Sequence, residues 1–312
     1  MELLIWVAVF IVSILVLVKA ADFFTGAAEK IGHVLRLPSF VVGVIIVGFG
    51  TSLPELISSI IAVRSGSSEM VVGNVLGSNI TNIFLVLGVV AILKPNVKIR
   101  YDLLKLDLPI LLGSAFLVAL MLWDLSFSLG EAVLCLVCLV FYFFSSFQSD
   151  KGPEATPAVE CEVKVGFLVW LTLVVSVAFV YVGARYVVES VINLSRILSI
   201  GTDVIALSAV AIGTSLPEIT VAISAARKGN YEMVIGNLIG SNIFNSFAVL
   251  AIPAFVGRLN IPRSIPDFAL PVFVAATLLA VVIVVDRRLN RWEGALLLSF
   301  YLFFIGKLYG WM

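Results

Sequence analysis

Two glutamates stand inside long apolar stretches of this 312-residue chain, each at the end of the same motif. Glu55 closes the first copy of GTSLPE and Glu218 closes the second, 163 residues later. An ionisable side chain at bilayer depth costs at least about 2.5–3.5 kcal/mol, so its presence there points to function. Two carboxylates brought together repel one another, and a cation between them removes that conflict. The pair therefore predicts a cation site.

The residues around both glutamates supply oxygen ligands. Pro54 and Pro217 lack an N–H, which leaves the carbonyls of Gly50 and Gly213 without their usual helical donor. Further hydroxyls and nearby carbonyls come from four residues of the motif: Thr51, Ser52, Thr214 and Ser215. Hard cations such as Ca²⁺ take about six to eight oxygens, whereas zinc and copper favour Cys or His. The motif therefore favours a hard cation.

A second duplicated element, G-N-x-x-G-S-N-I-x-N, occupies residues 73–82 and 236–245. Its glycines, four residues apart, allow close approach of helices. The serine and the last asparagine of each copy share one helix face, which favours ion contact for Ser78, Asn82, Ser241 and Asn245. For the other asparagines, ion contact and hydrogen bonding between helices are equally supported: Asn74, Asn79, Asn237 and Asn242.

The amino-acid composition indicates which kind of secondary structure holds these residues in place. Hydrophobic residues make up 61% of the chain, charged residues 13%, and the mean hydropathy is +1.14. Soluble domains have about 45–50% apolar and about 25% charged residues, so a soluble globular protein is excluded, as is a disordered chain. The net charge of zero excludes a basic nucleic-acid-binding protein. The long apolar runs predict an all-α membrane protein.

Ten apolar stretches approach the length that a bilayer requires, five on each side of a polar break. They lie at about 3–25, 38–63, 70–93, 103–123, 129–147, 165–190, 201–226, 233–257, 267–285 and 292–311. Lys19 is expected to close the first stretch, and Asp22 to pair with Lys19 or to cap the helix. The predicted organisation is one membrane unit: a five-helix repeat (1–147), a cytoplasmic linker (148–164) and a second five-helix repeat (165–312).

The two halves derive from a duplication. Residues 50–87 align with 213–250 without gaps, and 23 of 38 positions are identical. Five helices per half is an odd number, so the second half must enter the membrane from the opposite side. This predicts an inverted-topology repeat, with the site at the midplane between the halves.

Loop charges predict the orientation in a cell membrane. Fourteen of the 20 Lys and Arg residues fall in the loops that face the cytoplasm if both termini are extracellular, and six fall on the other side. Cytoplasmic loops carry the excess of positive charge, so extracellular N- and C-termini are expected.

At these motifs the chain resembles the cation/calcium exchanger superfamily, specifically the prokaryotic sodium/calcium exchangers, whose α-repeats look like the paired elements. The resemblance implies a Ca²⁺ site made by Glu55, Glu218 and the backbone carbonyls of Thr51 and Thr214. It implies flanking Na⁺ sites, with Asn82 and Asn245 lining the middle. The Na⁺ sites would use Ser52, Ser78, Ser215, Ser241 and the carbonyls of Gly48 and Ala211. The first and sixth helices would slide against the other eight.

The implied activity is Na⁺/Ca²⁺ antiport by alternating access, electrogenic with about three Na⁺ per Ca²⁺ if one net charge moves per cycle. Some potassium-dependent members have Asp at the position of Asn245, which argues against K⁺ co-transport here. Proton/calcium members carry a different motif in place of GTSLPE, so H⁺/Ca²⁺ exchange is the alternative. The ions are substrates, no cofactor is expected, and a single chain in the bilayer is expected to be the transport unit.

Two other classes of protein have to be weighed. A cation channel could use the same oxygens, and only counter-ion dependence of the flux separates it from an exchanger. An intramembrane hydrolase would need a serine with a base. The single histidine is His33, and neither Ser52 nor Ser215 lies in a G-x-S-x-G motif, so an enzyme is not expected.

Overall fold

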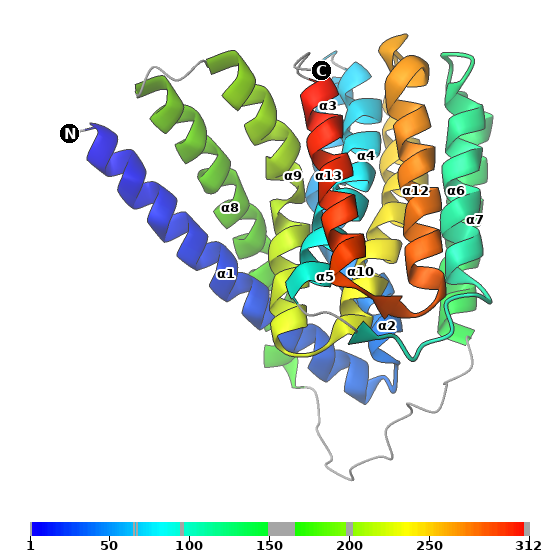
Figure 1. Ribbon diagram of the computed structural model, residues 1–312, viewed down its shortest axis with the longest axis horizontal. Coiled ribbons are helices and arrows are strands. Elements are labelled where there is room, and N and C mark those ends of the chain that lie inside the picture. The colour runs from blue at the N-terminus through cyan, green and yellow to red at the C-terminus, as the bar shows by residue number, and fades with distance from the viewer. Residues whose placement is uncertain are drawn as a thin grey trace.

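The computed structural model describes residues 2–64, 66, 68–93, 97–148, 166–197 and 202–308. These residues form helices that run side by side, with α1 and α8 slanting away at one edge (Figure 1). In the first half the elements are α1 (Glu2–Val34), α2 (Ser39–Val42), η1 (Gly43–Gly48), α3 (Phe49–Arg64), α4 (Glu69–Thr81), η2 (Asn82–Leu87), α5 (Gly88–Leu93), β1 (Val97–Lys98), α6 (Asp107–Leu122) and α7 (Leu129–Gln148).

The second half has the same general order. Its elements are α8 (Phe167–Ile197), α9 (Thr202–Arg227), α10 (Tyr231–Phe244), η3 (Asn245–Val249), α11 (Leu250–Ala254), η4 (Ile265–Ala269), α12 (Leu270–Val285), β2 (Arg288–Leu289) and α13 (Arg291–Leu308). The η segments are π-helical turns that continue directly into α-helix. Of the predicted linker, all but Gln148 lies outside the described residues.

Within the described residues, seven helical spans are long and apolar enough to cross a membrane. They are Glu2–Val34, Ser39–Arg64, Glu69–Leu93, Leu129–Phe147, Phe167–Leu194, Tyr231–Ala254 and Ile265–Val285. α6 is apolar but has only 16 residues, and α13 carries Arg291, Glu293 and Lys307 among its 18. The protein is thus an all-helical membrane protein.

The first helix differs from its predicted form. α1 runs for 33 residues, through Lys19 to Val34, and so extends beyond the apolar stretch expected at about 3–25. Lys19 is exposed on this helix. A single charge does not end a helix because lysine is a good helix former and its long side chain reaches water from within an apolar segment.

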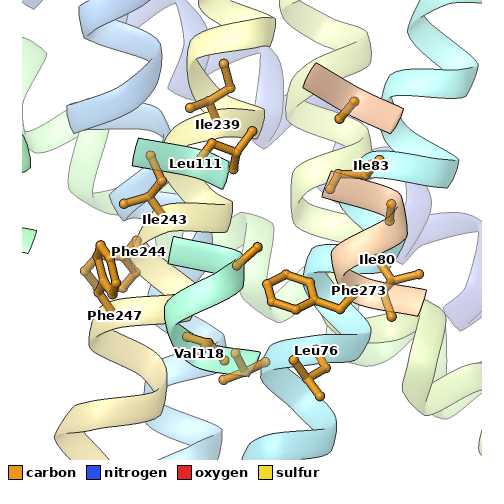
Figure 2. Packing of buried hydrophobic residues seen from close by; sticks show 14 of the residues in the cluster. Leu76, Ile80, Ile83, Leu111, Val118, Ile239, Ile243, Phe244, Phe247 and Phe273 are labelled. Atoms are coloured by element: carbon orange, nitrogen blue, oxygen red, sulfur yellow. The ribbon is translucent and has the colours of Figure 1, made fainter. Parts of the chain in front are cut away.

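Two apolar clusters hold the bundle together. The larger joins α4, α6, α10 and α12, and Figure 2 shows side chains such as Leu76, Val118, Ile243 and Phe273 within it. The smaller joins α1, α8 and α9. α1 and α8 pack closely, since a Cβ at Gly183 would lie 3.0 Å from Leu17. The pair therefore forms a lateral unit with most of its surface available to lipid.

A short antiparallel ladder ties two loops together at the end of the bundle opposite the start of α1 (Figure 1). β1 pairs with β2, and the Ile99 N–H donates to the Arg287 carbonyl at 2.9 Å. The Arg287 guanidinium also pairs with Asp102. The loop before α6 and the loop before α13 are therefore held in a fixed arrangement.

Candidate functional site

π-helical turns mark equivalent positions in the two halves. η2 begins at Asn82 and η3 begins at Asn245, which are 163 residues apart like the duplicated motifs. Single π-helical turns inside α-helices occur frequently at functional sites because they widen the helix and shift its hydrogen bonds. α3 and α9 continue as helices through Pro54 and Pro217. Irregular backbone therefore lies at the asparagines of the second element in both halves, and in the first half also at η1, which leads directly into α3.

The two predicted glutamates come together from opposite halves. Glu55 on α3 is 1% exposed and Glu218 on α9 is 2% exposed. Their carboxylates are close enough for electrostatic repulsion. The Thr51 side chain lies near Glu218 and so crosses between the halves. Two buried acids at close range form a site with a strong preference for positive charge.

Many oxygens of the predicted site are buried and have no hydrogen-bond donor. The set comprises both carboxylate oxygens of Glu55 and Glu218, the hydroxyls of Ser52, Ser78 and Ser215, and the Oδ1 atoms of Asn82 and Asn245. Leaving a buried polar group unpaired costs about 1–3 kcal/mol, and more for a charged group. Several oxygen-ligated cations bound side by side would satisfy these nine atoms between them. In the described part of the chain no group of three His, Cys, Asp or Glu residues forms an alternative metal site.

A polar network beside the glutamates joins η1 to α10. The Gly48 carbonyl accepts from Thr51 Oγ1 at 3.4 Å and from Ser241 Oγ at 3.3 Å. Asn237 Oδ1 lies 3.3 Å from each of the same two hydroxyls, so each hydroxyl proton is shared between Asn237 Oδ1 and the Gly48 carbonyl. The structure therefore brings Ser241 into contact with Gly48 and Thr51, which lie 193 and 190 residues before it in the sequence. By accepting these hydrogen bonds, Asn237 contributes to the contact between α3 and α10.

The remaining asparagines hold the helices together. Asn79 Nδ2 donates to the Asn242 carbonyl at 3.3 Å and to Ser246 Oγ at 3.0 Å. Asn82 Nδ2 donates to Asn242 Oδ1 at 3.1 Å, which leaves Asn82 Oδ1 for another partner. These bonds run between α4–η2 and α10–η3, so Asn79 and Asn242 act as helix contacts in this structure.

Asn74 has a local role behind the first glutamate. Its Nδ2 atom donates to the Glu55 carbonyl at 3.3 Å and to Ser59 Oγ at 3.1 Å. These bonds fix α4 against α3 one turn beyond the carboxylate. Of the predicted ligands, Ala211 and Thr214 lie in α9 where the side chains are outside the described part of the structure.

A further polar cluster was not predicted from the sequence. Asp22 Oδ1 accepts from Ser224 Oγ at 2.6 Å, and the Asp22 carbonyl accepts from Lys228 Nζ at 2.7 Å. The expected pairing of Asp22 with Lys19 is therefore wrong, because α1 turns Asp22 toward α9. The available signal was that Ser224 departs from the repeat, where Ile61 is its counterpart.

Comparison with known proteins agrees with this arrangement. Residues 5–148 and 168–310 match the family described as "Sodium/calcium exchanger protein". The sodium/calcium exchanger MaX1 of Methanosarcina acetivorans is 34% identical, over 96% of this chain and 97% of its own. The inner membrane protein YrbG of Escherichia coli is 34% identical, over 80% of this chain and 79% of its own.

A solved structure shares the fold over almost the whole chain. The sodium-calcium exchanger NCX_Mj, soaked with 10 mM Na⁺ and zero Ca²⁺, superposes with a TM-score of 0.85 at 29% identity. The match covers 98% of this chain and 99% of that one. The sequence match spans both halves and the structural match extends from end to end. This multi-pass membrane protein therefore belongs to the sodium/calcium exchanger protein family.

Proposed function

We propose that the protein is a secondary antiporter that exchanges Na⁺ for Ca²⁺ across a cell membrane. The observation that carries the proposal is the set of nine buried oxygens without hydrogen-bond donors around Glu55 and Glu218. Family membership and the printed functions of MaX1 and NCX_Mj support the same activity. The exchanged ions are substrates, and the chain needs no cofactor for this activity.

We assign Ca²⁺ to the space between the two carboxylates. Glu55 and Glu218 supply its charge-neutralising ligands, together with the backbone carbonyls of Thr51 and Thr214. Na⁺ takes flanking positions, and Asn82 and Asn245 line the middle. The Na⁺ ligands are Ser52, Ser78, Ser215, Ser241 and the carbonyls of Gly48 and Ala211. The short distance between Ser241 Oγ and the Gly48 carbonyl supports one of these positions.

Charge balance explains why the ions exchange rather than bind together. The two carboxylates give the site a charge near −2, which one Ca²⁺ or two Na⁺ neutralise. A third Na⁺ leaves one positive charge in excess, so a three-for-one exchange moves one net charge per cycle. That charge is worth about 2.3 kcal/mol per 100 mV of membrane potential. Competition for shared oxygens excludes simultaneous occupancy.

The proposed topology is ten membrane helices in two inverted five-helix repeats, 1–147 and 165–312, joined by a cytoplasmic linker, with both termini extracellular. The start of α1 and the end of α13 lie at the same end of the bundle, while the basic β1–β2 loops lie at the other (Figure 1). This distribution supports the orientation expected from loop charge. One chain contains both halves of the site, so one chain suffices for transport.

The test is ⁴⁵Ca²⁺ uptake into proteoliposomes loaded with Na⁺, K⁺ or acid. Uptake should follow the Na⁺ gradient and stop when K⁺ replaces Na⁺ inside. Uptake driven by a proton gradient and indifferent to Na⁺ would establish the H⁺/Ca²⁺ alternative. Uptake that needs no counter-ion at all would indicate a channel. If exchange is electrogenic, a membrane potential imposed across the proteoliposome membrane should change the rate of ⁴⁵Ca²⁺ uptake.

A further inference from the structure

The β1–β2 ladder places two cations directly opposite one another. Lys98 pairs with Arg288 in the register, and both residues are exposed. The bond from the Ile99 N–H to the Arg287 carbonyl makes this the pair without mutual hydrogen bonds, in which side chains lie closest. Like charges opposite each other on a ladder are destabilising. The fold therefore holds a charge conflict that a bound anion would relieve.

The acidic residues nearby are already engaged by other groups. Asp286 Oδ1 accepts from the Arg288 backbone N–H at 2.9 Å, and Asp102 pairs with Arg287 and Lys105. Glu293 accepts from the Asn290 N–H at 2.8 Å. Among the described residues, neither Lys98 nor the Arg288 side chain forms a salt bridge. Asp286 and Glu293 keep their negative charge while they accept these backbone bonds, but in the described structure neither carboxylate forms a salt bridge with the two cations.

The surroundings place this pair at a membrane surface. Trp292, in the first turn of α13, is 86% exposed, and tryptophan is enriched where the bilayer meets water. Exposed Leu93 and Leu296 follow on α5 and α13, two helices that pack together. Arg291 is also exposed. Cations beside an apolar, tryptophan-bearing helix face fit a lipid with an anionic head and acyl chains.

We propose that Lys98 and Arg288 bind the phosphate of an anionic phospholipid in the adjacent leaflet. The headgroup phosphate lies between the two side chains, near Arg291, and the acyl chains follow the exposed face of α5 and α13. Basic pockets beside transmembrane helices bind anionic headgroups in this way. The β1–β2 ladder and the Arg287–Asp102 pair pre-organise the site. The proposal is independent of which ions the protein exchanges.

The experiment is native mass spectrometry of the full chain in detergent, titrated with phosphatidylglycerol or phosphatidylcholine. The wild type should retain phosphatidylglycerol in about tenfold preference. K98Q/R288Q should lose that preference, and K98R/R288K should keep it. The matched control K30Q/R227Q removes two exposed cations at the same end of the bundle and should behave as wild type.

Three results would overturn the proposal. Unchanged preference in K98Q/R288Q would exclude these residues, and equal loss in K30Q/R227Q would show bulk charge attraction instead. Displacement of the lipid by an equal concentration of inorganic phosphate would identify a soluble anion as the ligand. Thermal melting in lipid-free detergent gives an independent check. There R288Q should melt at the same temperature as wild type or higher, and a lower melting temperature would contradict the charge conflict.

Discussion

The same glycine pair packs differently in the two halves of the molecule. In α10, a Cβ at Gly236 would lie 2.1 Å from the Phe40 carbonyl oxygen, and one at Gly240 would lie 2.6 Å from that of Val44. In α4, the counterparts Gly73 and Gly77 have no described heavy atom within 4 Å of an added Cβ. Among the described residues, the duplicated motif therefore makes a backbone-to-backbone contact in only one half.

The difference follows from the partner segment. α10 packs on α2 and η1, where Gly43 lets the backbones meet, since a Cβ there would lie 2.3 Å from the Met233 carbonyl oxygen. At the equivalent position of the second half the sequence has Ala206. An alanine there adds a methyl group that Gly43 lacks, and the side chains of that segment lie outside the described part of the structure. Repeating a small-residue motif thus permits close packing, but both faces must lack side chains for it to occur.

The largest expected effect tests what the halves share. Glu55→Gln and Glu218→Gln should each abolish Na⁺-driven ⁴⁵Ca²⁺ uptake, because each removes one of two charges facing the ion. At an effective dielectric of about 20, one unit interaction at about 4 Å is worth about 4 kcal/mol, roughly a thousandfold in affinity. Glu69→Gln, an exposed acid at the start of α4, is the control and should leave uptake intact. Full activity in either Glu55→Gln or Glu218→Gln would contradict the proposal that both carboxylates bind the transported ion.

A substitution at the glycine pair should show the difference directly. Gly236→Ala should destabilise the protein by about 1–3 kcal/mol, since the methyl group has no space beside Phe40. Gly73→Ala should be neutral or stabilise by up to about 1 kcal/mol, because alanine is the better helix former. Thermal unfolding of the purified variants gives the sign of each change. Equal losses would show that α4 is packed as tightly as α10.

The interhelical asparagines offer a smaller contrast between the halves. Asn79→Ala removes two donors and leaves Ser246 without its partner, at a cost of about 1–3 kcal/mol. Asn242→Ala leaves one buried donor, Asn82 Nδ2, without its acceptor and should cost less, because one bond is lost instead of two. The melting temperatures should fall in that order. The reverse order would mean that the Asn242 amide has a role beyond this contact.

The smallest effect concerns the contact between α1 and α9. Ser224→Ala removes the bond to Asp22 and the 3.1 Å contact with Thr25 Oγ1, and should cost about 0.5–1.5 kcal/mol. Ser299→Ala is the control, because Ser299 is exposed and bonds only within α13 to the Ala295 carbonyl. Chemical denaturation of the two variants measures the difference. Identical midpoints would show that the smaller apolar cluster holds α1 without help from the polar bond.

Much of the fold followed from local properties of the sequence. Apolar length located the helices to within a few residues, as for α4, which begins at Glu69 where the expected stretch begins at 70. The exceptions were α1, which continues past its expected end at about 25 to Val34, and α8, which continues past about 190 to Ile197. The extension of α1 buries Ile31 against other helices. π-helical turns at Asn82 and Asn245 left no sequence signal beyond the motif itself.

Sequence alone determined the class of membrane protein, the duplication and the identity of the oxygen-bearing residues, because these depend on composition and spacing. Tertiary structure decided which residues meet: that Gly48 and Thr51 contact Ser241, that Asp22 turns to Ser224, and that Lys98 faces Arg288. Such contacts join segments far apart in the chain and depend on how closely two backbones approach. That approach is a property of both partners together, which no single segment encodes.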